Sequence, residues 1–319
     1  APGRELSPGT FNIDGSLTLA AGSSLNLRLG AAGVVGGPGN DWLRVSGNVS
    51  LAGTLNVADS GSFSTGVYRL VDYGGSLGGA GLALGALPAG FSASDFTVQV
   101  AVPNQVNLVV SGANVLFWDG AQTVANNTVN GGPGNWTTGS TNWTNASGSA
   151  NTPWASRFAV FTAGAGTVTV ADAVVTTGMQ FVTTGYVVDA RPGGSIALLG
   201  NAVLRVDPLA AASISAPLVG SGTLVKSDTG TLTLSGSNSY TGGTQVQDGR
   251  LVVTAAGGFG LASGAVTVAA TATSELSFEG GASAGGVAVT NLGSGSATAQ
   301  SATTFRDTAT ADTASILNS

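Results

Sequence analysis

The chain has 319 residues, of which 43% are hydrophobic and only 8% are charged, about a third of the usual charged share. This balance excludes a disordered chain, which combines few apolar residues with high charge. A net charge of -6 with only ten basic residues argues against nucleic acid as a partner, because phosphate binding needs clustered Lys and Arg. The chain contains neither Cys nor His, which removes thiolate chemistry and the commonest metal ligand and general base.

Alternating apolar and polar residues dominate from the N-terminal part onward. In "GSLTLAAGSSLNLRLG" (residues 15–30), the leucines point one way and Ser, Thr, Asn and Arg point the other. Similar runs of four to seven residues recur along the chain, each followed by a turn signal, and no stretch keeps a helical period. The sequence therefore predicts an all-β protein.

The stretch "GGPGNDWLRV" (residues 36–45) fits one copy of the calcium-binding nonapeptide G-G-x-G-x-D-x-U-x. Calcium β-rolls bind the ion between tandem copies, because each ion takes oxygens from two successive turns. The neighbouring nonapeptides do not repeat the motif, and Asp41 is the only carboxylate within reach by sequence. We predict a glycine turn that leads into a strand, with calcium as the alternative.

Four of the five tryptophans lie in the middle of the chain, in a segment rich in Asn, Thr and Gly with weaker alternation. They are Trp118, Trp136, Trp143 and Trp154. We interpret residues 113–165 as an insertion or a distinct lobe between N-terminal coils (1–112) and C-terminal coils (166–319). The four indoles either pack together against the scaffold, or expose their faces for stacking on sugar rings or for contact with a surface.

Strand-and-turn units of similar texture recur without a clear linker, which favours a solenoid of coils with about 20–25 residues each. The low charge fits this architecture, because stacked like charges would repel, whereas rows of Thr, Ser and Asn share hydrogen bonds.

Residues 220–253 read "GSGTLVKSDTGTLTLSGSNSYTGGTQVQDGRLVV" and closely resemble the autotransporter-associated β-strand repeat, also called the passenger-associated transport repeat. The matching positions are Gly222, Leu224, Lys226, Gly230, Leu232, Leu234, Gly236, Asn238, Tyr240, Gly242, Gly243, Thr244, Val246, Gly249 and Leu251. Asp228 stands where the family usually has Gly. The resemblance implies a right-handed parallel β-helix, carried across the outer membrane by a C-terminal β-barrel. We expect that barrel only in a precursor, and "APGRELSPGT" resembles a mature or cut terminus rather than a signal peptide.

Physical arguments assign roles within the repeat. Leu224, Leu232, Leu234 and Leu251 would form interior ladders. Gly242 and Gly243 would allow a corner with positive φ, and the Asn238 amide suits a turn. Lys226, the only lysine, is expected on the outer face.

Catalysis finds little support in the sequence. Glu275 and Glu279 share one strand face but are separated by roughly 13 Å along it, and no paired acidic residues of the D-x-D type occur. Serine nucleophiles lack a His base, and the glycine-rich "GGPGNW" (131–136) has no phosphate-binding Lys. We expect no enzyme activity, no cofactor and no metal site.

The sequence therefore predicts a non-enzymatic, extracellular or cell-surface protein of structural or adhesive function. Its expected partners are cell-surface or matrix components, or further copies of itself joined end to end into filaments, since coil-like sequence continues to "TASILNS". A protein that binds or degrades polysaccharides is the alternative.

Overall fold

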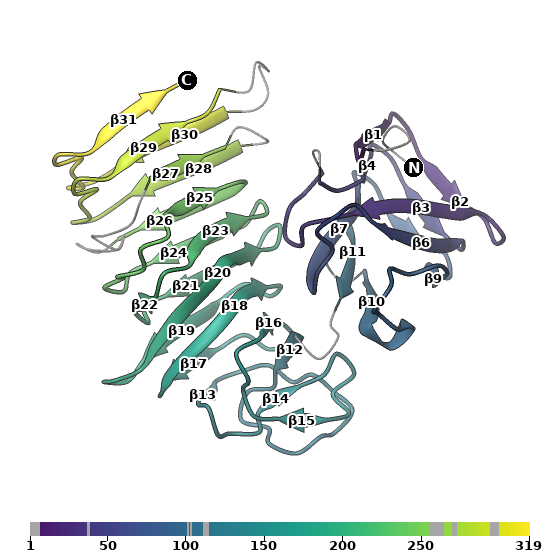
Figure 1. Cartoon of the computed structure of the whole chain (residues 1–319), viewed down its shortest axis with the longest axis horizontal. Helices are drawn as coiled ribbons and strands as arrows, with labels where there is room; N and C mark the ends of the chain where they lie inside the picture. The colour runs from purple at the N-terminus through teal and green to yellow at the C-terminus, as the bar shows by residue number, and fades with distance from the viewer. Residues whose placement is uncertain are drawn as a thin grey trace. The chain divides into compact units, whose positions relative to one another are not determined.

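The computed structural model describes residues 7–36, 39–100, 102, 104–110, 115–254, 265–269, 273–293 and 300–319. The chain divides into two compact units, Ala1–Val115 and Leu116–Ser319 (Figure 1). Strands build both units, and the described ranges contain no α-helix, only the 3-10 turn η1 (Ala93–Asp95). Nothing helical in these ranges has the length and apolar character that a membrane span requires. The predicted all-β class is confirmed.

The first unit has three sheets, and each group of three successive strands places one strand in each sheet. The first sheet has the order β1 (Thr10–Ile13), β4 (Trp42–Val45), β7 (Gly66–Tyr73), β11 (Gln105–Val110) and β10 (Phe96–Gln99). The second contains β2 (Leu17–Leu19), β5 (Val49–Leu51) and β8 (Leu77–Gly78), and the third β3 (Ser24–Leu29), β6 (Thr54–Asp59) and β9 (Ala83–Leu84).

Parallel pairing in the first unit shows how far one coil advances the chain. Thr10 pairs with Trp42, and Leu43 pairs with Val71. These coils are longer than the predicted length of about 20–25 residues, because each one crosses three sheets. The antiparallel strands β10 and β11 follow β7 in the first sheet, a departure from coil stacking that has no signal in the sequence pattern.

The second unit has two larger sheets. One has the order β15 (Asn151–Thr152), β14 (Trp143–Thr144), β12 (Val115–Trp118), β16 (Phe158–Phe161), β18 (Ala173–Phe181), β20 (Ser195–Val206), β23 (Thr223–Ser227), β25 (Thr244–Val246), β27 (Val266–Val268), β29 (Ala288–Asn291) and β31 (Ser315–Asn318), with β22 (Leu218–Val219) also beside β20. The other has the order β13 (Gly134–Trp136), β17 (Thr167–Val170), β19 (Tyr186–Ala190), β21 (Ala211–Ile214), β24 (Thr231–Leu234), β26 (Gly249–Val253), β28 (Thr273–Phe278) and β30 (Gln300–Phe305).

From β16 onward the second unit is a parallel β-solenoid, seen in Figure 1 as strands stacked from teal to yellow. Thr231 pairs with Arg250 in a short coil, and Leu276 pairs with Thr303 in a longer one. The spacings of these two pairs along the chain bracket the predicted coil length. The right-handed sense of the coil remains a prediction.

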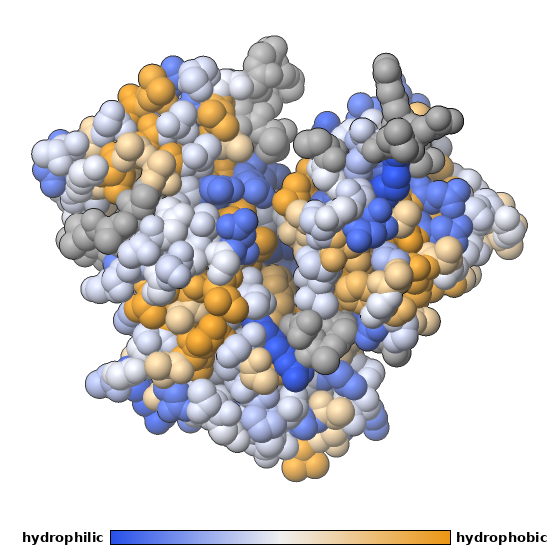
Figure 2. Space-filling model, in the orientation of Figure 1, coloured by the Kyte–Doolittle hydropathy of each residue, from blue (hydrophilic) through white to orange (hydrophobic). Residues whose placement is uncertain are grey.

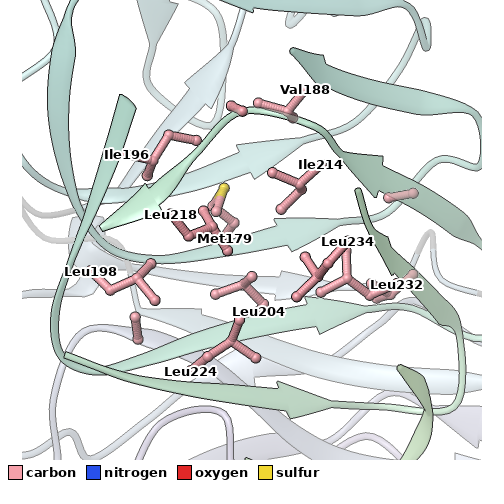
Figure 3. Close-up of a cluster of buried hydrophobic side chains, with 14 of the residues drawn as sticks. Met179, Val188, Ile196, Leu198, Leu204, Ile214, Leu218, Leu224, Leu232 and Leu234 are labelled. Atoms are coloured by element: carbon pink, nitrogen blue, oxygen red, sulfur yellow. The ribbon is translucent and has the colours of Figure 1, made fainter. Parts of the chain in front are cut away.

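Alternation within each strand gives the solenoid its interior. Leu224, Leu232 and Leu234 are completely buried, and Figure 3 shows them projecting into the same enclosed space as Leu204 and Ile214. Burial of a leucine side chain contributes about 1.5–3 kcal/mol. Like side chains also stack from coil to coil, as in the parallel rings of Phe161 and Phe181, whose centroids are 4.9 Å apart.

Residues 115–165 supply strands to both sheets of the second unit. Strands β12, β14 and β15 pair antiparallel and continue the larger sheet, while β13 pairs parallel with β17 in the other sheet. The segment therefore supplies the first strands of the second unit, and its tryptophans share that unit's hydrophobic core.

Candidate functional site: the repeat, the tryptophan cluster and the outer face

The four tryptophans predicted to contact either each other or a ligand are all in the interior. Trp118, Trp136 and Trp143 are completely buried and Trp154 is 6% exposed. Trp143 lies 5.0 Å from Trp118, 5.0 Å from Trp136 and 4.4 Å from Trp154 between ring centroids. These rings offer no exposed face for a sugar, so the hypothesis of a glycan or surface contact at these four residues is wrong. They fill the interior at the start of the second unit, because large aromatic side chains are most stable when they are buried together.

The glycines of the repeat allow neighbouring coils to approach closely. A Cβ on Gly222 would lie 2.4 Å from the carbonyl oxygen of Leu198, and one on Gly230 would lie 2.4 Å from that of Asp207. Gly242 and Gly243 were expected to form a corner with positive φ, and Gly243 has φ +85. At Gly242 a glycine is required for space, because a Cβ there would lie 2.5 Å from the Gly222 backbone.

Two polar side chains of the repeat bridge buried positions. The Oδ1 atom of Asn238 accepts a hydrogen bond of 2.8 Å from the backbone N–H of Leu218, one coil earlier. The hydroxyls of Tyr240 and Thr244 are 2.7 Å apart. Burial raises the pKa of the Tyr240 phenol to about 12, so this side chain stays neutral and serves the core.

Lys226 is where the sequence prediction fails. It was expected on the outer face, but its side chain is completely buried. Its Nζ donates hydrogen bonds to the carbonyl oxygens of Ser227, Asp228 and Asp248, at 3.1, 2.5 and 3.0 Å. A buried ammonium is tolerated when its donors find acceptors, and here the acceptors are backbone carbonyls of two successive turns.

Asp228, the departure from the family pattern, adopts φ +66. This is the left-handed conformation that glycine reaches without strain and that Asp and Asn reach more readily than other residues. Its Oδ1 accepts a 2.7 Å hydrogen bond from the Thr229 N–H, and its Oδ2 lies 3.0 Å from Arg205.

The turn at residues 36–45 uses its carboxylate for structure. Asp41 is completely buried and accepts hydrogen bonds of 2.8 Å from the backbone N–H groups of Gly9 and Arg28. Gly37 and Pro38 lie outside the described residues, and the rest of the described chain contains no group of three or more Asp or Glu side chains that could hold a metal ion. This geometry matches a structural turn.

Glu275 and Glu279, weighed as acidic residues for catalysis, meet two arginines on the outer side of β26, β28 and β30. Arg250 and Arg306 each contact both carboxylates, with Arg306 Nη2 3.0 Å from Glu275 Oε1. Partial burial acts to raise the pKa of Glu275, but hydrogen bonds from Thr304 and Arg306 and the two arginine charges outweigh it, so this pKa is lowered. Both carboxylates are therefore committed to ion pairs between coils.

The remaining outer face of the smaller sheet of the second unit is mostly uncharged, with Asp189 of β19 beside Thr169 as a carboxylate on it. Thr167, Thr169, Ser213, Thr231 and Thr233 are partly or fully exposed along β17, β21 and β24. Two larger apolar side chains lie on neighbouring elements: Val187 of β19 is 37% exposed, and Leu209, in the turn before β21, is 87% exposed. Figure 2 shows a surface of intermediate hydropathy with separate hydrophobic and hydrophilic areas.

A parallel β-solenoid with a repeat that has glycines at its close contacts and an outer face with few charges defines the class of protein. Comparison with known proteins makes it more specific. Residues 224–253 match the family described as Passenger-associated-transport-repeat. Over 303 residues the chain is 42% identical to the Adhesin BmaC autotransporter of Brucella suis biovar 1 (strain 1330), in a match that covers 88% of this chain but only 8% of the relative. No solved structure gives a significant match.

The chain is accordingly autotransporter passenger sequence that carries a passenger-associated transport repeat, as the resemblance predicted. Such a passenger lies at the cell surface or outside the cell.

Proposed function

We propose that this chain is a non-enzymatic part of an extracellular adhesin, and that the outer face of the smaller sheet in its second unit contacts cell-surface or matrix components. The observation that carries the proposal is the exposure of Val187 and Leu209 beside a row of Thr and Ser side chains. The relative is named an adhesin, which supports the same function.

The chemistry of this face favours neutral partners. Hydroxyl groups donate and accept hydrogen bonds, and exposed aliphatic side chains gain stability when a partner covers them. The ion-paired carboxylates near β28 leave no free acid and base pair there, which supports a binding function rather than cleavage of polysaccharides.

Adhesion of the purified chain to cultured cells and to immobilised matrix tests this proposal. We expect the double variant Val187→Thr, Leu209→Ser to lose most of the binding, with unchanged circular dichroism. Val124→Thr is the matched control, because Val124 is 72% exposed but lies in the loop after β12. Equal binding by the double variant and the control would contradict the proposed surface. Treating the cells with glycosidase or protease then distinguishes carbohydrate from protein partners.

Self-association is a second candidate. Ile316 and Leu317 of β31 are 40% and 59% exposed. Exposed apolar side chains gain stability when another copy of the chain covers them. We expect light scattering and electron microscopy to reveal concentration-dependent oligomers that Ile316→Lys prevents; monomers throughout would exclude filaments.

A further inference from the structure

Lys226 occupies a position that points into the core. On β23 it pairs in register with Leu204 of β20 and with Val246 of β25. Leu204 in turn pairs with Met179, and Val246 with Val268. One interior column therefore reads Met179, Leu204, Lys226, Val246 and Val268, and every member is completely buried. A charged side chain in an apolar column calls for a physical reason.

Three carbonyl oxygens surround the ammonium, and an ammonium has three N–H donors and no acceptor. One of these oxygens belongs to Ser227, the last residue of β23, and the next to Asp228, in the turn that follows it. The third belongs to Asp248, in the turn after β25. The two turns come together because Gly249 has φ +66, and a Cβ there would lie 2.5 Å from the Asp228 carbonyl oxygen. Lys226 therefore connects two successive coils through their corners.

The alternation of leucine and threonine in the surrounding strands does not by itself determine the register in which neighbouring coils pair. Strands such as β24 (TLTL) and β26 (GRLVV) alternate with a period of two, so a slip of one residue would turn the core residues outward. A slip of two residues, however, keeps every inward position inward. The hydrophobic pattern alone is therefore nearly indifferent to the slipped pairing.

We propose that Lys226 acts together with the close glycine contact at Gly249 to fix the register of the repeat on the following coil. In a two-residue slip, the Asp248 carbonyl would move by about 6–7 Å along the strand direction, and the buried ammonium would lose a partner from the neighbouring coil. An incompletely paired buried charge is strongly unfavourable, so the native register prevails. Leucine or methionine at this position would fill the column equally well but would leave only the glycine contact at Gly249 to distinguish the two registers.

Disulfide trapping in the full chain tests this inference, because the protein contains no cysteine of its own. Thr231 and Arg250 are native partners, and neighbouring strands place such Cα atoms within the range that a disulfide spans. The pair Thr231→Cys, Arg250→Cys therefore reports the native register. The pair Thr233→Cys, Arg250→Cys reports the slip by two, since diagonal neighbours are about 7–8 Å apart and do not bridge in the native register.

With Lys226 present, we expect the slipped pair to give less than about 1% disulfide, and with Lys226→Met about 10%, a tenfold or larger change. Leu204→Met is the matched control, because it substitutes the same column one coil earlier and leaves the ammonium in place; it should behave like the parent chain. If Lys226→Met gives only the native disulfide, the inference is wrong.

A second variant covers the case in which Lys226→Met does not fold. Lys226→Ala removes the ammonium and leaves space for a small one, so refolding in ethylammonium chloride should restore the native disulfide. Tetramethylammonium chloride has no N–H donor and should not restore it. Equal yields with the two salts would overturn the assigned function of the ammonium.

Discussion

Trp143 contacts more aromatic rings than its tryptophan neighbours do, including Phe161 at 5.8 Å, so its removal leaves a large cavity. We expect Trp143→Ala to lower the free energy of unfolding by about 3–5 kcal/mol. Urea titration followed by circular dichroism measures this change. Val124→Ala, at an exposed position, is the control and should stay within about 0.5 kcal/mol of the parent chain. Similar midpoints for the two variants would contradict a structural role for the cluster.

Two substitutions at Asp228 distinguish the energetic effect of its backbone conformation from that of its charge. Asp228→Asn keeps an acceptor for the Thr229 N–H and tolerates φ +66, but it loses the carboxylate that pairs with Arg205; we expect a loss of about 1.5–3 kcal/mol. Asp228→Ala should lose about 1–2 kcal/mol more, because alanine is strained in the left-handed region. Guanidinium titration of both variants gives the order. An alanine variant as stable as the asparagine variant would show that the turn relaxes.

Between neighbouring strands, the ion pairs of Arg250 and Arg306 with Glu275 and Glu279 make the stability of the last coils sensitive to acid. The pKa of Glu275 is lowered in the folded state, so folding is favoured while this carboxylate is ionised. That contribution is complete above the unfolded-state pKa and is lost as the pH falls through the lower folded-state value. Because the pairs are partly exposed, we expect Glu275→Gln to reduce stability at pH 7 by at most about 1 kcal/mol.

The measurement is the difference in urea midpoint between the parent chain and Glu275→Gln as the pH falls from neutral to strongly acid. We expect the difference to shrink towards zero in acid and in high salt, which screens exposed charges. Asp14→Asn serves as the control, since this exposed carboxylate lies outside the group. A difference that is independent of both pH and salt would mean that the glutamate stabilises the coil through packing alone.

Sequence patterning predicted the strands of the second unit well, because alternation and glycine turns are local signals. Leu224, Leu232 and Leu251 face the core as their period-two spacing requires. The direction of Lys226 could not be predicted in this way. Its carbonyl acceptors come from Asp248 as well as from adjacent residues, and the distant acceptor exists only once two coils have stacked. Polarity alone wrongly placed this residue outside.

The sequence placed a boundary after residue 112, but as the start of an insertion or a distinct lobe rather than of a second compact unit. That interpretation came from the weaker alternation around Trp136 and Trp143. The alternation is weak here because β12 and β14 are short strands that pair antiparallel. Their tryptophan rings are buried by contacts with residues distant in the sequence, which a local pattern does not reveal. The number of sheets crossed by a coil, three in the first unit, has no local signature either.

At the scale of the whole chain, the described residues form two separate hydrophobic cores, one in each unit. Each core has its own buried surface, so each unit has its own source of cooperative stability. We expect two unfolding transitions in urea. Tryptophan fluorescence should follow mainly the second unit, which contains Trp118, Trp136, Trp143 and Trp154, whereas circular dichroism should report both transitions.

The assignment of the two transitions follows from substitutions that act on one core. Trp143→Ala should move only the transition seen by fluorescence, and Leu55→Ala, at a completely buried position of the first unit, should move only the other. Each shift reflects the cavity left in its own core, because substitutions without shared partners act additively. If either variant moved both transitions together, the units would unfold as one cooperative body, and the proposed adhesive face would depend on the stability of the whole chain.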